Sequence, residues 1–226
     1  MSQIESSPVW LFHCRVDVAR LGSLAAAFRL LPAGEKARAE RFARETDRAH
    51  FVAAHLLLRA ALRETGLLAP EIFPRNSHGK PLLPGGGADF NLTHTEGLVA
   101  CAIARGCEVG LDAEARQRDL EWSKFARLVL APAERALVEA APASASQTFL
   151  RFWTLKEAVV KAAGLGLYQP LPDFTVSLDP PGLARTATAL GDAARWRLAA
   201  PEISPDHWLA LATRSPGTDG QERPVV

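Results

Sequence analysis

The order of helical and strand patterns along this chain constrains its fold more than any other feature. In the first half, apolar residues recur at the spacing of an amphipathic helix over residues 47–63. Short strand patterns follow at 89–93, 98–104 and 109–114. The second half repeats this order, with helical patterns at 123–129, 132–140 and 146–163 before strand patterns at 174–178, 194–199 and 208–213. Helices followed by strands, twice, predict an α+β pseudo-repeat with its boundary near Cys107.

The composition argues against several classes of function. Lys and Arg number 26 against 25 Asp and Glu, so no basic excess indicates a nucleic-acid partner. No apolar run approaches the length of about 18 residues that spans a bilayer, and we expect no membrane insertion. Cys14, Cys101 and Cys107 form an odd set without CxxC spacing, and the N-terminal segment lacks a signal-peptide pattern. We therefore expect a cytoplasmic protein of one or two compact domains.

Residues 152–166, FWTLKEAVVKAAGLG, place three side chains on one face of the predicted helix. Trp153, Glu157 and Lys161 are spaced four residues apart, so they follow one another along that face. A Glu followed four residues later by a Lys is ordinarily a solvated helix pair. This segment alone is therefore compatible with a surface pair as well as with a functional site.

The strand pattern at 109–114, VGLDAE, adds two carboxylates. Its apolar residues alternate with Gly110, Asp112 and Glu114, as in a half-buried strand, so the two acids project from one face. With Glu157 and Lys161 they supply three acids and one ammonium group. Such a set can hold Mg²⁺ against a pyrophosphate and neutralise a departing phosphate.

Four ordered motifs resemble those of a known family. GLDAE and WTLKEAVVKAAGLGL are similar to the two signature motifs of the 4′-phosphopantetheinyl transferases of the surfactin-synthetase-activating type. The GKP segment 79–81 and the FNLTH segment 90–94 precede them, as in that family. The resemblance covers residues 35–178 and implies two similar α+β subdomains, a pseudo-dimer, with coenzyme A between them. We expect the subdomains at 1–107 and 108–214, followed by a flexible tail at 215–226.

The resemblance also implies a reaction. The family moves 4′-phosphopantetheine from coenzyme A to a serine of an apo acyl or peptidyl carrier protein, using Mg²⁺ and releasing adenosine 3′,5′-bisphosphate. The resemblance assigns Asp112, Glu114 and Glu157 to Mg²⁺ and Lys161 to the leaving phosphate. Glu157 is also the candidate general base for the serine, and a metal-activated water is the alternative. We expect a monomer in which Asp112, Glu157 and Lys161 are catalytic.

Residues of the first half match positions that contact coenzyme A in the family. Arg38, in the helical pattern 35–48, falls where relatives present a cation to the ribose 3′-phosphate. Arg75 and Lys80 match positions that touch the adenosine end, where Gly79 permits close approach of the backbone.

Thr93 and His94 match a Ser-His pair that grips coenzyme A phosphates, and Thr93 keeps the hydroxyl of the serine that it replaces. The residues expected to bind coenzyme A are Arg38, Arg75, Gly79, Lys80, Asn91, Thr93, His94, Asp112, Glu157 and Lys161.

Two other classes of function use some of these groups. A metal-dependent phosphodiesterase also uses Asp, Glu and Lys, but nucleases of the ExK type place Glu and Lys two residues apart on a strand. Glu157 and Lys161 are four apart in a helical pattern. A non-catalytic module that binds coenzyme A or a carrier protein would lose an acid, whereas all three are present. An assay of transfer from coenzyme A separates the three classes.

Overall fold

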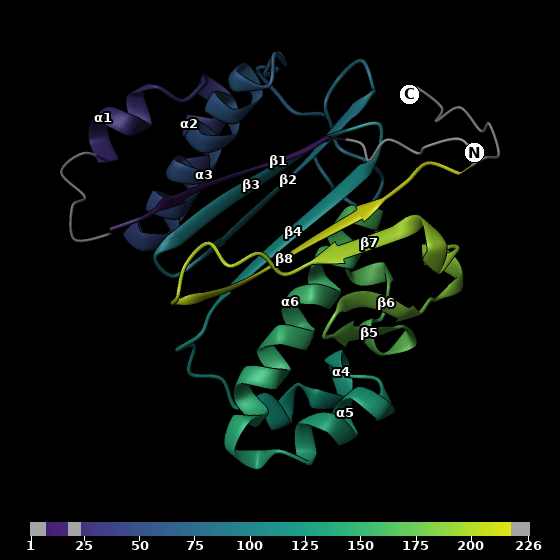
Figure 1. The fold of residues 1–226 in the computed structure, drawn as a ribbon. Coiled ribbons are helices and arrows are strands. Elements are labelled where there is room, and N and C mark those ends of the chain that lie inside the picture. The colour runs from purple at the N-terminus through teal and green to yellow at the C-terminus, as the bar shows by residue number, and fades with distance from the viewer. Residues whose placement is uncertain (1–7, 18–23, 218–226) are drawn as a thin grey trace.

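Two long helices enclose two antiparallel sheets in this protein, which a computed structural model describes over residues 8–17 and 24–217. Helix α3 (Glu45–Glu64) packs on β3 (Leu98–Arg105), and helix α6 (Ala145–Ala163) packs on β4 (Glu108–Ala115) and β8 (His207–Arg214). Figure 1 shows the strands between the two helices. The layers therefore run α3, first sheet, second sheet, α6.

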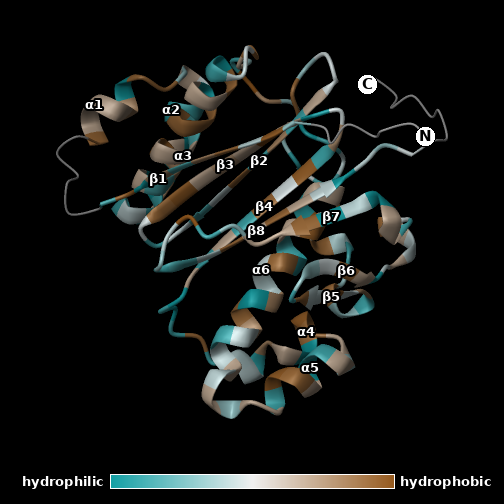
Figure 2. Cartoon of the chain, in the orientation of Figure 1, coloured by the Kyte–Doolittle hydropathy of each residue, from teal (hydrophilic) through white to brown (hydrophobic). Residues whose placement is uncertain are grey.

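The first sheet has the order β1-β3-β2, with β1 (Val9–Arg15) and β2 (Ala88–Thr95) antiparallel to β3. Side chains alternate across β3. Cys101 and Ile103 join the core cluster that contains Leu58 and Leu62 of α3. The intervening residues on the opposite face of β3 pack against β4. Figure 2 accordingly draws β3 largely in the brown of hydrophobic residues.

The second sheet has the order β4-β8-β7, with β7 (Trp196–Ala199) at one edge. The largest apolar cluster lies between this sheet, α6 and a two-stranded sheet of β5 (Thr175–Leu178) and β6 (Pro181–Arg185). The remaining helices are short: α1 (Leu24–Arg29), α2 (Ala33–Ala39), α4 (Ala126–Val129) and α5 (Pro132–Glu139). Single 3-10 turns are η2 (Trp122–Lys124), η3 (Pro142–Ser144), η4 (Gly166–Tyr168), η5 (Leu171–Asp173), η6 (Thr188–Leu190) and η7 (Ala193–Arg195).

Strand β4 is buried on both faces, so the prediction of a half-buried strand is wrong. One face packs on the first sheet, and the other lies against α6. Gly110 makes the second contact possible, because a Cβ there would lie 2.0 Å from the carbonyl oxygen of Ala158 and 2.3 Å from the nitrogen of Ala162. The backbone of α6 therefore approaches β4 more closely than any side chain would allow.

Most predicted elements are confirmed with small shifts at their ends. The helices predicted at 47–63 and 146–163 are α3 and α6, and the strand patterns at 89–93 and 98–104 are β2 and β3. Strands β1 and β6 lie where no strand was predicted.

The helical pattern 35–48 is wrong as a single helix, because the chain leaves the helical path between α2 and α3. Glu35 of α2 is buried, and its carboxylate lies 2.8 Å from a guanidinium nitrogen of Arg59 on α3. This ion pair joins α2 to α3.

No helix in the described ranges is long and apolar enough to cross a membrane. Most of the tail predicted at 215–226 lies outside the described residues. Within them, Ser215 is tied to Arg195, whose backbone oxygen accepts from the Ser215 N–H at 2.9 Å.

Candidate active site

Close packing of α6 on β4 brings the two acidic motifs together. Asp112 and Glu114 project from the β4 face that Gly110 leaves open to α6, and Glu157 and Lys161 lie on that helix. The Lys161 Nζ is 2.5 Å from Asp112 Oδ1 and 3.3 Å from the carbonyl oxygen of Leu111. Lys161 therefore forms an ion pair with Asp112 on β4. A purely solvated pair between Lys161 and Glu157 on the helix would not include this contact.

The pKa values of the three acids are all raised, and burial is the largest cause in each. Burial raises the pKa of Asp112 even though Lys161 opposes the shift. Burial also raises the pKa of Glu157, and the charges of Asp112 and Glu114 raise it further. The pKa of Glu114 is raised by burial and by Asp112, although Arg118 forms an ion pair with Glu114. The site holds more negative charge than its own cations neutralise.

A hard cation fits this donor set. Asp112 is 6% exposed, and its Oδ2 is a buried oxygen without a hydrogen-bond partner, which is costly unless something binds it. Carboxylate oxygens are the ligands that Mg²⁺ prefers. In the described part of the chain, no group of three or more His, Cys, Asp or Glu side chains can hold a metal ion by itself. An ion here would therefore need further oxygen ligands from substrate phosphate and water.

The imidazole of His50 lies beside that of His94, and the sequence analysis did not assign His50 to the site. The rings of His94 and His50 stack with centroids 5.9 Å apart. Nδ1 of His50 lies 2.9 Å from the carbonyl oxygen of Thr46, while its Nε2 is buried without a partner. Burial lowers the pKa of His94, and the charges of His50 and Lys161 lower it further. The sequence signal was only a histidine on the predicted helix 47–63.

Arg38 and Arg75 lie near each other. The Arg38 guanidinium is 5.4 Å from the ring centroid of Phe51, and its pKa is lowered by burial and by the charge of Arg75. Arg75 also donates to the carbonyl oxygen of Gly79 at 2.5 Å, which ties the arginine to a turn where Gly79 has a φ of +89°. Two neighbouring guanidinium groups favour an anion between them.

Lys80 and Asn91, which the resemblance places against coenzyme A, make contacts inside the protein through the Lys80 ammonium and the Asn91 Oδ1. The Lys80 side chain is 9% exposed, and its ammonium donates to Asp89 Oδ2 at 2.6 Å and to the carbonyl oxygens of Val109 and Ala162 at 3.1 Å. The Asn91 Oδ1 accepts from the N–H of Leu111 at 3.1 Å. The three protons of the ammonium are therefore all committed.

Lys156, the neighbour of Glu157 in the helical motif, points into the core instead. It is fully buried, and its Nζ lies 2.7 Å from Glu134 Oε2 and donates to the carbonyl oxygens of Leu171 and Phe174. Lys161 is thus the lysine of the motif that reaches the acids, and Lys156 fixes α6 to the elements around it.

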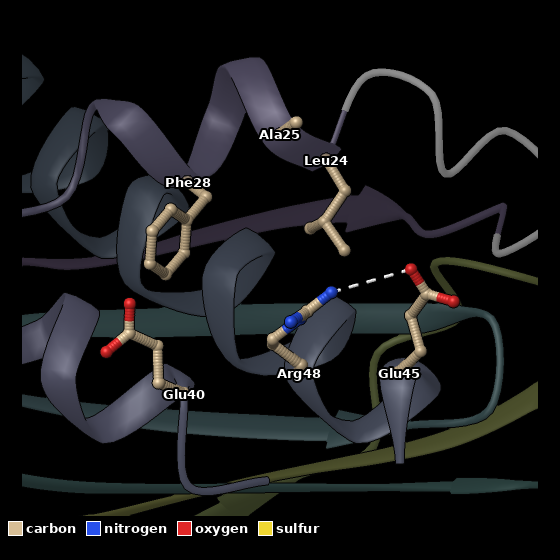
Figure 3. A pocket seen from close by; sticks show the side chains of 6 residues that line it. All are labelled: Leu24, Ala25, Phe28, Glu40, Glu45 and Arg48. Carbon is tan, nitrogen blue, oxygen red and sulfur yellow. Dashed lines mark hydrogen bonds and ion pairs between the residues drawn. The ribbon is translucent and has the colours of Figure 1, made fainter. Parts of the chain in front are cut away.

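A cavity of about 280 Å³ lies apart from this site, between α1 and α3. Figure 3 shows its side chains, with the 3.5 Å contact between Arg48 and Glu45 at its edge. None of the predicted site residues lines it; the lining residues are Leu24, Ala25, Phe28, Glu40, Glu45 and Arg48.

A pair of strand carboxylates faces a helix-borne Glu and Lys, and one acid oxygen has no partner, which is a donor set that suits a divalent cation. The comparisons with known proteins assign the chain to a family. The sequence profile of the 4′-phosphopantetheinyl transferase superfamily matches residues 108–212, which include both acidic motifs.

Relatives match over most of the chain. The 4′-phosphopantetheinyl transferase HetI of Nostoc sp. is 33% identical over 190 residues, which cover 80% of this chain and 78% of HetI. The 4′-phosphopantetheinyl transferase psf-1 of Bacillus pumilus is 28% identical, with 80% and 78% covered. A putative 4′-phosphopantetheinyl transferase of Synechocystis sp. is 28% identical, with 81% and 79% covered. The chain belongs to the 4′-phosphopantetheinyl transferases of the surfactin-synthetase-activating type.

Proposed function

We propose that this enzyme moves 4′-phosphopantetheine from coenzyme A to a serine hydroxyl of an apo carrier protein and releases adenosine 3′,5′-bisphosphate. The observation that carries the proposal is the contact between the two signature motifs, in which Lys161 pairs with Asp112 while Asp112 Oδ2 stays without a partner. One motif thereby supplies acids for a cation and the other supplies an ammonium for a departing phosphate.

Asp112, Glu114 and Glu157 are the residues that would hold Mg²⁺. When bound, the ion would withdraw charge from the pyrophosphate of coenzyme A and from the departing phosphate. Lys161 adds a fixed positive charge at the same place, and Glu157 is the residue that we propose accepts the serine proton. Glu157 and Lys161 lie on a helix, which departs from the strand arrangement of the ExK nucleases.

The cations of the first half would bind the phosphates of coenzyme A. Arg38 and Arg75 lie near each other, and His94 lies close enough to Lys161 for their charges to interact. We assign Arg38 and His94 to the ribose 3′-phosphate. Arg75 and the turn at Gly79 we assign to the adenosine end of coenzyme A.

The phosphate assignment can be tested with two ligands. Arg38→Ala and His94→Ala should weaken the binding of coenzyme A more than that of 3′-dephospho-coenzyme A, because only the first carries their proposed partner. Arg41→Ala, an exposed arginine just beyond α2, serves as the control and should change neither affinity. Equal losses for both ligands would contradict the assignment.

Three further proposals concern the subdomains, the cellular location and the oligomeric state. The two halves, 1–107 and 108–214, are proposed to be similar subdomains, which is supported by a long helix on a three-stranded antiparallel sheet in each. A cytoplasmic location is supported by the family's use of coenzyme A and by the free thiols of Cys14 and Cys101. We also propose a monomer, which sedimentation of the full chain would test.

A further inference from the structure

Strands β2 and β4 belong to different sheets, yet they are joined by a row of side chains. Four residues of β2 accept hydrogen bonds from backbone N–H groups of β4, and each donor lies 20 residues after its acceptor. The acceptors are Asp89, Asn91, Thr93 and Thr95, and their donors are Val109, Leu111, Ala113 and Ala115. The constant offset means that the two strands run parallel. We call these four contacts the seam.

The seam satisfies a strand edge that would otherwise be buried and unpaired. Backbone N–H groups that lose water without a partner cost free energy, so the edge of β4 needs acceptors. Lysine ammonium groups donate to carbonyl oxygens of the same strand. Lys80 donates to the carbonyl oxygen of Val109, and Lys161 donates to that of Leu111. The seam therefore fixes the position of the strand that carries Asp112.

Thr93 is the seam residue that also touches the site. Its hydroxyl oxygen accepts from the N–H of Ala113 at 3.1 Å and donates to Asp112 Oδ1 at 3.4 Å. Thr93 is 4% exposed. A hydroxyl has one proton to donate, and here that proton is directed to Asp112.

The two oxygens of Asp112 consequently differ. Oδ1 receives Lys161 at 2.5 Å and the hydroxyl of Thr93, whereas Oδ2 has no partner. We infer that Thr93 is a positioning residue, which holds Asp112 Oδ1 and so leaves Oδ2 directed to a divalent cation. This inference rests on the proposed function and differs from a direct contact between Thr93 and a coenzyme A phosphate.

The seam offers a matched control for the experiment. Thr95 makes the same kind of contact, with the N–H of Ala115 at 3.2 Å. Thr93→Val and Thr95→Val each remove one such hydroxyl with little change in shape. Both variants should lower the melting temperature, Thr93→Val by on the order of 5 °C and Thr95→Val by less, because Thr95 is half-buried and makes only the one contact. Only Thr93→Val should change the metal site.

Mn²⁺ serves as a probe for the cation, and free Mn²⁺ is measured by electron paramagnetic resonance with the full chain and coenzyme A present. We expect Thr93→Val to weaken Mn²⁺ binding and to lower kcat, each by about 10-fold, with the KM for coenzyme A little changed. Thr95→Val should match the wild type in Mn²⁺ binding and in kcat. Thr93→Ser, which keeps the hydroxyl, should bind Mn²⁺ as the wild type does. Should Thr93→Val not fold, Thr93→Ala goes through the same comparison.

Two results would overturn the inference. One is equal Mn²⁺ affinity in Thr93→Val and Thr95→Val. The other is a loss of coenzyme A affinity in Thr93→Val that is the same without metal, since this would indicate direct contact with coenzyme A. A wild-type protein that binds Mn²⁺ but transfers nothing would refute the proposed function instead, and the Mn²⁺ comparison would still decide the role of Thr93.

Discussion

At the scale of single residues, the site is organised around one buried carboxylate. Asp112 has Lys161 on one oxygen and no partner on the other, and its charge raises the pKa of both Glu114 and Glu157. A protein that buries an acid in this way needs a cation to compensate it. The Lys supplies part of the compensation, and the remaining negative charge explains why a divalent ion is expected.

Replacement of Lys161 tests its role most sharply. Because Lys161 faces Asp112 in a partly buried site, Lys161→Met should lower the single-turnover rate of transfer by about 10²-fold or more at saturating coenzyme A. Thermal melting measured alongside would show that the variant remains folded. A rate within twofold of wild type would mean that Lys161 contributes only a surface ion pair.

The raised pKa of Glu157 should make the stability of the metal-free protein depend on pH. The pKa of Glu157 is raised in the folded state, so the folded protein holds this proton more tightly than the unfolded chain. Wild-type stability should therefore fall as the pH rises from the ordinary glutamate value through the raised one. Glu157→Gln lacks this loss and should melt higher than wild type at neutral pH without Mg²⁺.

The difference in melting temperature between Glu157→Gln and wild type should shrink as the pH falls from neutral to about 4.5, and below that pH, where the wild-type residue is protonated in both states, it should shrink no further. Addition of Mg²⁺ and coenzyme A at neutral pH should stabilise the wild type more than the variant. A difference that stays constant across this range would show that Glu157 carries no raised pKa.

At the scale of elements, the site depends on how closely α6 approaches β4. The periodicity of α3 and α6 was enough to predict both helices, because their apolar faces recur at helical spacing. The break after α2 was not predicted, and the ion pair that joins α2 to α3 links Glu35 to Arg59, 24 residues away. Likewise, the sequence of β4 alternates as a half-buried strand would, and only α6 buries its second face.

The same limit applies to the candidate site. The motifs singled out Asp112, Glu157 and Lys161 because each motif is a pattern of residues close together in the sequence. The internal contacts of Lys80 and Thr93 depend on the seam and on α6, which are distant in sequence. His50 was missed for the same reason, since its stacking on His94 joins a helix to a strand.

Gly110→Ala tests the close approach of α6 directly. The new methyl group would lie 2.0 Å from a backbone oxygen of α6, which cannot move aside as a side chain could. We expect a loss of about 3 kcal/mol or more of the free energy of unfolding, with transfer activity lost in whatever protein remains folded. Chemical denaturation measures the first, and the carrier assay measures the second.

Gly34→Ala is the control for Gly110→Ala, because Gly34 lies in α2 and a Cβ there meets only Ile72 at 4.0 Å. Its stability should stay level or rise by up to about 1 kcal/mol. Similar behaviour of the two variants would show that the contact between Gly110 and α6 is unimportant.

At the scale of the whole molecule, Lys80 links elements from both halves. Its ammonium joins Asp89 of β2, Val109 of β4 and Ala162 of α6. Lys80→Met leaves the buried Asp89 carboxylate without its ion pair and should cost about 3 to 5 kcal/mol of the free energy of unfolding.

The KM for coenzyme A in folded Lys80→Met protein should change little, because the Lys80 ammonium is already saturated by internal acceptors. Denaturant titration and steady-state kinetics would give both quantities. Unchanged stability together with a strongly raised KM would show instead that Lys80 binds coenzyme A.

Transfer to a carrier protein tests the activity proposed for the whole chain. The full chain would be incubated with coenzyme A, Mg²⁺ and a panel of apo acyl and peptidyl carrier proteins, and the carriers weighed by intact-mass spectrometry. We predict that at least one carrier gains a single 4′-phosphopantetheinyl group on its serine, that adenosine 3′,5′-bisphosphate appears in equal amount, and that a chelator or Asp112→Ala abolishes both. A folded wild-type protein that modifies no carrier in the panel, or that only hydrolyses coenzyme A, would refute the proposed transfer reaction.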